Sequence, residues 1–184
     1  MKRKAAVAGQ FYPGDSTRLR AAIADLTAPE RPKKKAIAVV SPHAGYIYSG
    51  PVAGEVFATT VMPPVFVILG PAHREIGPLF AIQSRGSWET PLGETPIDAA
   101  LAALIAAGCP QVVEDGRAHA FEHSLEVQLP FIQYFRPDAV LVPICVSAAA
   151  GFDSLESRGR ALAGAVRADG REIPISVSTA LLKD

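Results

Sequence analysis

Two histidines follow apolar runs that are typical of buried strands. His43 comes shortly after AIAVV at positions 36–40, and His73 comes shortly after VFVILG at positions 65–70. Open α/β sheets bind ligands at the carboxyl ends of their strands, so this is where a pocket is expected. Neutral imidazole nitrogen is a good ligand for iron, copper and zinc. We therefore expect His43 and His73 to face each other from neighbouring parallel strands and to bind a divalent metal, although either ring could instead cap its strand end by bonding to the backbone.

A second pattern suggests a different metal site. The residues HAFEH at positions 119–123 match the H-x-x-E-H pattern of inverted zinc peptidases. In that reading His119 and His123 bind zinc from one helical face, and Glu122 acts as the general base. Three fixed positions in five match easily by chance, and this interpretation leaves the first two histidines without a role. The alternative for His119 is an exposed residue at a helix start.

Composition limits the class of protein. The chain has 184 residues, of which 49% are hydrophobic and 20% are charged, as in one globular domain. Basic and acidic residues are equal at 18 each, so no overall positive field favours nucleic acid or an anionic membrane. The chain lacks an apolar stretch long enough for a membrane span and lacks a signal-peptide core, which predicts a cytoplasmic protein. Cys109 and Cys145 are expected to be reduced, with Cys145 packed in a strand as a small apolar side chain.

Hydrophobic periodicity predicts alternating strands and helices. Strands are predicted at 36–40, 65–70, 79–84, 139–146 and 173–178, and helices at 19–26, 51–60, 97–107, 121–135 and 155–168, with a loop over 84–96. The run at 36–40 is expected to be covered on both faces. This order indicates a three-layer α/β domain, with helices on both faces of a mostly parallel or mixed central sheet.

Several segments together resemble the Memo family, whose bacterial members are also called AmmeMemoRadiSam system protein B. The segments are VAGQFYPGD, SPHAGYIYSG, ILGPAH, WETPLGE and EHSLEVQLPF, and the likeness runs from about residue 8 to residue 177. This resemblance implies a fold similar to that of class III extradiol dioxygenases of the LigB type. Those enzymes use non-heme iron and no organic cofactor.

The resemblance also implies roles for individual residues. It makes His43 and His73 metal ligands, and it makes Phe11 and Tyr48 aromatic residues that line the same pocket. It places Glu122 and His123 near that cleft, either in its wall or as ligands.

The end of the chain departs from the family pattern. Memo-like proteins continue into a Ser-Ser-Asp-x-x-His segment, whose histidine corresponds to the dioxygenase acid/base residue, and later supply a third metal ligand. Here Ser178 and Thr179 are followed by Ala180 and four further residues, and neither group has a counterpart. We therefore expect a single Memo-like domain over residues 1–184 that lacks the family's C-terminal portion. Such a domain would expose a sheet edge able to pair with a second copy.

Three hypotheses for function follow. The first is a metal-binding protein with a dioxygenase-related pocket and a redox-linked role, in which Glu122, Cys145 or water completes the metal's ligand shell. The second is a non-enzymatic module that binds a peptide or a small molecule in the same cleft. The third is a zinc hydrolase built on residues 119–123.

Overall fold

A six-stranded sheet forms the centre of the molecule. The computed structural model describes residues 1–74, 76–168 and 175–179. The strand order is β2-β9-β3-β8-β4-β7, and every neighbouring pair is parallel except β4 with β8. The strands are β2 (Ala38–Pro42), β9 (Ile175–Thr179), β3 (Val65–Ala72), β8 (Val140–Ser147), β4 (Phe80–Ile82) and β7 (Val112–Glu114).

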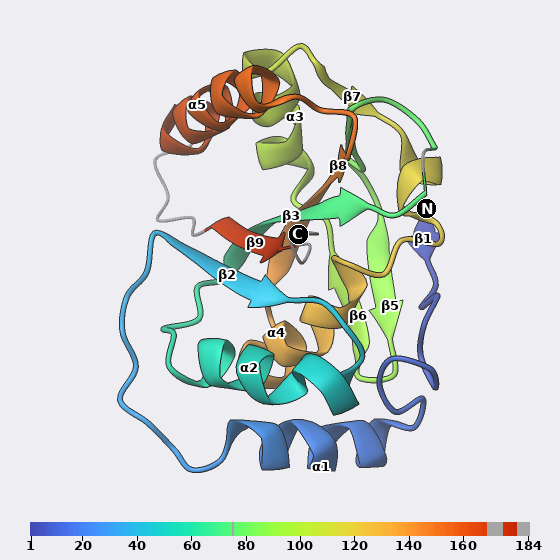
Figure 1. The fold of residues 1–184 in the computed structure, drawn as a ribbon, viewed down its shortest axis with the longest axis vertical. Helices are drawn as coiled ribbons and strands as arrows, with labels where there is room; N and C mark the ends of the chain where they lie inside the picture. The colour runs from blue at the N-terminus through green and yellow to red at the C-terminus, as the bar shows by residue number, and fades with distance from the viewer. Residues whose placement is uncertain (75, 169–174, 180–184) are drawn as a thin grey trace.

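Helices cover both faces of this sheet (Figure 1). One side carries α1 (Ser16–Thr27), α2 (Tyr46–Ala58) and α4 (Leu129–Phe135), and the other carries α3 (Ala99–Gly108) and α5 (Phe152–Ala168). Asp15 caps α1 by accepting a hydrogen bond from the backbone N–H of Arg18. The prediction of a layered α/β fold with a mixed sheet is confirmed.

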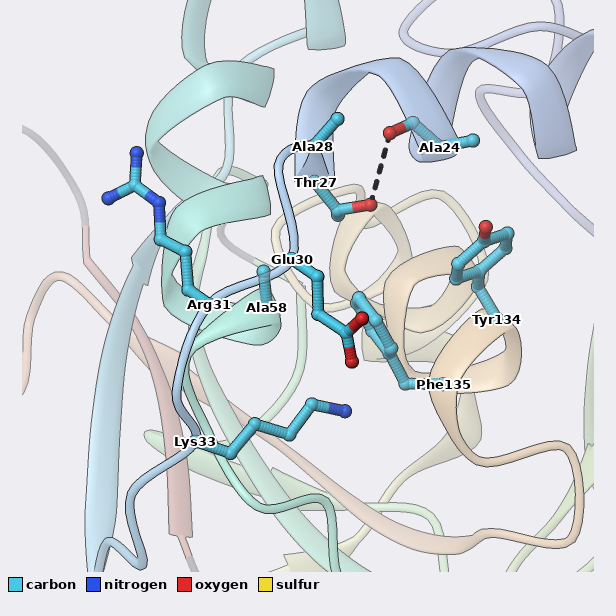
Figure 2. A pocket seen from close by; sticks show the side chains of 9 residues that line it. All are labelled: Ala24, Thr27, Ala28, Glu30, Arg31, Lys33, Ala58, Tyr134 and Phe135. Atoms are coloured by element: carbon cyan, nitrogen blue, oxygen red, sulfur yellow. Dashed lines mark hydrogen bonds between the residues drawn. The ribbon is translucent and has the colours of Figure 1, made fainter.

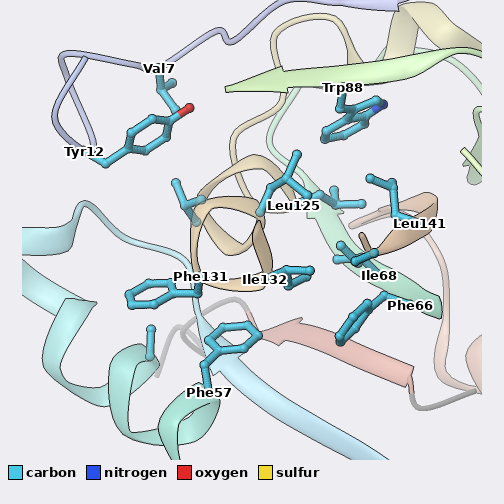
Figure 3. Packing of buried hydrophobic residues seen from close by; sticks show 14 of the residues in the cluster. Val7, Tyr12, Phe57, Phe66, Ile68, Trp88, Leu125, Phe131, Ile132 and Leu141 are labelled. Carbon is cyan, nitrogen blue, oxygen red and sulfur yellow. The ribbon is translucent and has the colours of Figure 1, made fainter. Parts of the chain in front are cut away.

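The central strand β3 shows how the sheet separates two hydrophobic cores. Phe66 and Ile68 pack in the core under α1, α2 and α4, whereas Val65 and Val67 pack in the core under α3 and α5. This alternation follows from the two-residue period of a strand. Figure 3 shows the first of these cores, to which β3 contributes Phe66 and Ile68 and the helices contribute Phe57 and Phe131.

The segment predicted as a loop over 84–96 is instead a hairpin. It contains β5 (Ser87–Thr90) and β6 (Gly93–Pro96), which are antiparallel, and β5 also pairs with β1 (Lys2–Arg3). Buried and less buried residues alternate along β5, so Trp88 packs into the core while its neighbours do not. The run is only four residues long, and its polar residues concealed this alternation in the sequence.

Two further predictions, for the strand at 36–40 and for the helix that follows it, require correction. Strand β2 is an edge strand rather than a strand covered on both faces, and Ile37 just before it is 89% exposed. Helix α2 begins at Tyr46, not at Pro51, which lies inside the helix. Proline at this position removes a hydrogen bond to the carbonyl of Ile47, a residue that is itself exposed and open to water.

The continuous helix predicted over 121–135 does not form. A short 3-10 helix, η1 (Gly116–His119), is followed by turns, a second 3-10 helix, η2 (Glu126–Gln128), and then α4. Phe121, the first apolar residue of that predicted helix, is 64% exposed. Pro130 lies in the first turn of α4, where its missing N–H costs nothing. The backbone before α4 is instead held by buried polar side chains.

Cys145 packs inside a strand, as expected. Both thiols, Cys109 and Cys145, are buried and outside any disulfide, and Cys145 belongs to β8. Of the helices in the part of the chain that the structure describes, none is both long and apolar enough to cross a membrane.

Candidate metal site

Three histidines converge at one edge of the sheet. His43 directly follows β2 and His73 directly follows β3, while His123 comes from the turn before η2. The ring centroids of His43 and His73 are 5.1 Å apart, and those of His73 and His123 are 4.2 Å apart. One ring nitrogen from each histidine lies within 4.8 Å of the others. This separation is short enough for one ion to contact all three nitrogens.

The two strand-end histidines meet in a slightly different way from the one expected. Strands β2 and β3 are parallel in sense but not adjacent, because β9 lies between them. The carboxyl ends of the three strands still share one edge of the sheet. His43 and His73 therefore reach each other across the end of the intervening strand.

Burial favours the neutral forms of His43 and His123. The pKa of His43 is lowered from 6.5 to about 4, first by burial and then by the nearby His73 and His123. Burial, followed by the nearby His73, also lowers the pKa of His123. The side chain of His73 is the most open of the three, at 41% exposed. Neutral imidazoles offer the lone pairs that a metal requires, so protons compete weakly for this site near pH 7.

Glu122 fixes the orientation of His73. One carboxylate oxygen, Oε2, accepts the backbone N–H of His73 at 2.6 Å, and the other, Oε1, lies 2.9 Å from the ring Nδ1 of the same residue. Oε1 also accepts the backbone N–H groups of His123 and Ser124, both at 2.8 Å. Burial raises the pKa of Glu122, but these hydrogen bonds outweigh it and the net pKa is lowered. An ionised carboxylate only accepts, so His73 carries a proton on Nδ1, and the lone pair of Nε2 is the one left for a metal.

The segment 122–128, which contains Glu122, also fixes the two loops that carry His43 and His73. The hydroxyl of Ser124 donates to the carbonyl of Pro71 at 2.9 Å, two residues before His73. The amide of Gln128 donates to the carbonyl of Pro42 at 3.0 Å, directly before His43. Sequence reasoning missed both residues. The available signal was that every second residue from 122 to 128 is polar, namely Glu122, Ser124, Glu126 and Gln128. This spacing does not match the period of a helix.

The two predicted aromatic residues occupy different environments. The ring of Phe11 lies 4.6 Å from that of His123 and forms one wall of the cluster. Tyr48 lies in the first turn of α2 and is 79% exposed, with its ring beside Gly45. A pocket-lining role for Tyr48 therefore stays a prediction.

The H-x-x-E-H interpretation is wrong in its geometry. His119 is fully buried in η1, where its Nδ1 lies 3.2 Å from the sulfur of Cys145 and its ring lies edge-on to Trp88. Burial, followed by the nearby Arg3, lowers the pKa of His119 to about 4. The turns between His119 and His123 prevent the two side chains from sharing a helical face. His123 lies beside His43 and His73 instead, whereas this interpretation pairs it with His119.

The donor set fits a borderline divalent metal. Three imidazole nitrogens suit zinc, iron or copper better than they suit magnesium or calcium, which prefer oxygen. Sequence reasoning left the third ligand to Glu122, Cys145 or water. Glu122 is engaged in orienting His73 and Cys145 packs beside His119, whereas His123 supplies the third nitrogen.

A hollow lies away from the histidines, near Ala58 at the C-terminal end of α2. This hollow of about 250 Å³ shares no residue with the cluster. Figure 2 shows the side chains that line it, which are Ala24, Thr27, Ala28, Glu30, Arg31, Lys33, Ala58, Tyr134 and Phe135. Two of its cations already have partners, since Arg31 pairs with Glu55 and Lys33 lies over the ring of Phe135. The histidine cluster is therefore the stronger candidate site.

Comparison with known proteins agrees with the motifs. The sequence model of the Memo-like protein family matches residues 3–181. A MEMO1 family protein of Pyrobaculum arsenaticum is 41% identical over 96% of this chain and 67% of its own length. A MEMO1 family protein of Thermococcus onnurineus is 41% identical over 97% of this chain and 64% of its own length, and one from Thermotoga petrophila is 42% identical over 79% and 58%. The chain thus spans about two thirds or less of the length of these relatives. On this evidence the chain belongs to the Memo-like protein family.

Proposed function

We propose that this chain binds one divalent transition metal, either iron, copper or zinc, through His43, His73 and His123. The observation that carries the proposal is the convergence of three ring nitrogens within 4.8 Å of one another. The orientation of His73 by Glu122 supports it, because ligand histidines commonly donate their second N–H to a carboxylate.

An ion held by three protein ligands keeps open positions at which a small molecule can bind. Because the side chain of His73 is partly exposed, these positions are reachable from solvent. Phe11 supplies an apolar wall beside them. We therefore propose a small molecule or a peptide as the occupant of this cleft, and a redox-linked role if the ion is iron or copper.

The second candidate function uses the same cleft without a metal. Phe11 beside His123 would then contact an apolar part of a peptide or small molecule, and the neutral imidazoles would act as hydrogen-bond partners. This function predicts ligand binding that is insensitive to metal chelators. The zinc hydrolase loses its support because His119 lies outside the cluster.

Metal analysis of anaerobically purified protein tests the proposal. The wild type should carry about one metal ion per chain, and the double variant His43→Ala, His73→Ala should carry almost none. His123→Ala should retain less metal than the wild type. His119→Gln is the matched control, because His119 is the only histidine of the four in the chain outside the cluster, and it should retain full metal content. Equal metal content in the wild type and the double variant would refute the ligand assignment.

A further inference from the structure

Glu126 is a fully buried carboxylate that faces the N-terminal segment. Its Oε2 accepts from the guanidinium of Arg3 at 2.6 Å and from the backbone N–H of Ala6 at 2.8 Å. Its Oε1 accepts from the backbone N–H of Val7 at 3.1 Å and from the hydroxyl of Tyr12 at 2.6 Å. Four donors from one short stretch of chain therefore meet at a single side chain.

Residues 3–12 have little structure of their own to hold them. Strand β1 is only two residues long, and the rest of the segment is a turn closed by bonds from Gln10 and Phe11 to the carbonyl of Val7. Val7 and Tyr12 face the core from this loop (Figure 3). Beyond Arg3, which pairs with Trp88 in β5, these residues belong to no regular strand or helix, so contacts from other elements are needed to keep them in one position. Bonds to an ionised acceptor are among the stronger hydrogen bonds in a protein, so Glu126 supplies much of this restraint.

Residues 3–12 form part of the histidine site. The carbonyl of Phe11 accepts the backbone N–H of Tyr46, three residues after His43, at 2.7 Å. The ring of Phe11 lies against His123. A shift of residues 3–12 would therefore move the wall that covers His123.

We propose that Glu126 is a positioning residue that holds residues 3–12 in place, so that Phe11 covers His123 and slows exchange at the metal site. The part that concerns metal exchange rests on the proposed function. The part that concerns the position of Phe11 is independent of any metal. The two carboxylates of this segment thus have different roles. Glu122 orients the ring of His73, and Glu126 holds the residues that carry Phe11.

The test uses two perturbations of different severity. Glu126→Gln removes the charge, and Tyr12→Phe removes a single hydrogen bond while leaving the carboxylate in place, so it remains informative if the first variant fails to fold. Each is also made in a Phe11→Ala background. Asp115→Asn is the control, because Asp115 is another buried carboxylate that bonds to a nearby arginine, Arg117, and not to the N-terminal segment.

The first measurement is the ring C–H signal of His123 in the NMR spectrum of metal-free protein. Glu126→Gln and Tyr12→Phe should shift this signal toward its position in Phe11→Ala, and Asp115→Asn should not. The second measurement is the rate at which zinc passes from the loaded protein to a chelator. That rate should rise roughly two- to tenfold, as expected for the loss of one hydrogen bond.

The double variants separate positioning from a general loss of stability. If Glu126 acts through Phe11, the effects of Glu126→Gln and Tyr12→Phe disappear in the Phe11→Ala background. Fully additive effects, or an unchanged His123 signal in both single variants, would overturn the proposal. A wild type that binds none of zinc, iron and copper would refute the proposed function, while the NMR measurement on metal-free protein would still decide the role of Glu126.

Discussion

Replacing Glu122 by glutamine tests the central feature of the site, because the change removes the charge and keeps the size. The carboxylate accepts four hydrogen bonds, two from His73 and one each from the backbone of His123 and Ser124. A glutamine has one accepting oxygen and one donating NH₂ group. Whichever way the amide is turned, its NH₂ must face at least one buried N–H that has lost its acceptor.

Two separate losses follow from this substitution. A buried donor without an acceptor costs about 1–3 kcal/mol in the free energy of unfolding. The proton of His73 is also no longer forced onto Nδ1, so the ring presents its metal-binding nitrogen less often. Changes of this kind around metal ligands typically reduce metal affinity by about 10- to 100-fold, or roughly 1.4–2.8 kcal/mol.

The two losses can be measured apart. Zinc affinity is measured at neutral pH by competition with a chelating dye, and stability is measured by denaturant unfolding in the presence of a chelator. Asp115→Asn is again the matched control, since it neutralises a buried carboxylate that contacts an arginine and not a histidine. It should leave zinc affinity unchanged. If Glu122→Gln loses stability as expected but binds zinc within about twofold of the wild type, Glu122 does not orient a ligand and the reasoning fails.

Three further predictions concern other parts of the structure. Gly70→Ala would place a Cβ 2.6 Å from the hydroxyl of Ser124, so it should displace the loop of His73 and lower both stability and zinc affinity; normal zinc affinity would contradict this. The pKa of His119 is about 4 in the folded protein and 6.5 for an ordinary histidine, so the unfolded form binds a proton first as the pH falls. Its contribution to stability is therefore present above about pH 6.5 and lost toward pH 4, by up to roughly 3 kcal/mol. His119→Gln should lack this loss in denaturant unfolding across that range, and parallel curves for the two proteins would refute the assignment. Finally, if the exposed edge at β2 pairs two copies, light scattering should detect a dimer that Val40→Lys weakens, because Val40 is 55% exposed on that edge; a monomer at all concentrations would exclude this pairing.

The main architecture could be predicted from the sequence because it depends on strong local patterns. The runs at 65–70 and 139–146 are long and apolar, and they form the central strands β3 and β8. Placing a histidine directly after such a run needs only the rule that strand ends share an edge. The run at 36–40 looked equally buried, yet it lies at the sheet edge, because local composition does not record how many partners a strand has.

The segment before α4 could not be predicted because its determinants are long-range. The apolar spacing of Leu125, Leu129 and Ile132 is real, and all three are buried. Between the first two, however, side-chain bonds to distant loops replace the bonds of a regular helix. Glu126 reaches residues more than a hundred positions away along the chain, and Gln128 reaches Pro42. A window of neighbouring residues holds no information about such partners.

The buried polar residues of the segment 122–128 also indicate its function. Glu122, Ser124, Glu126 and Gln128 are all almost fully buried in a region that could have been filled with apolar side chains. Burying polar and charged groups is unfavourable unless each is hydrogen-bonded, and replacing such groups with well-packed apolar residues is often neutral or stabilising. Stability alone is therefore a poor explanation for four of them in seven residues. Their bonds lead to the loop of His73, to the residue before His43 and to the wall beside His123, so what they have in common is the geometry of the histidine cluster.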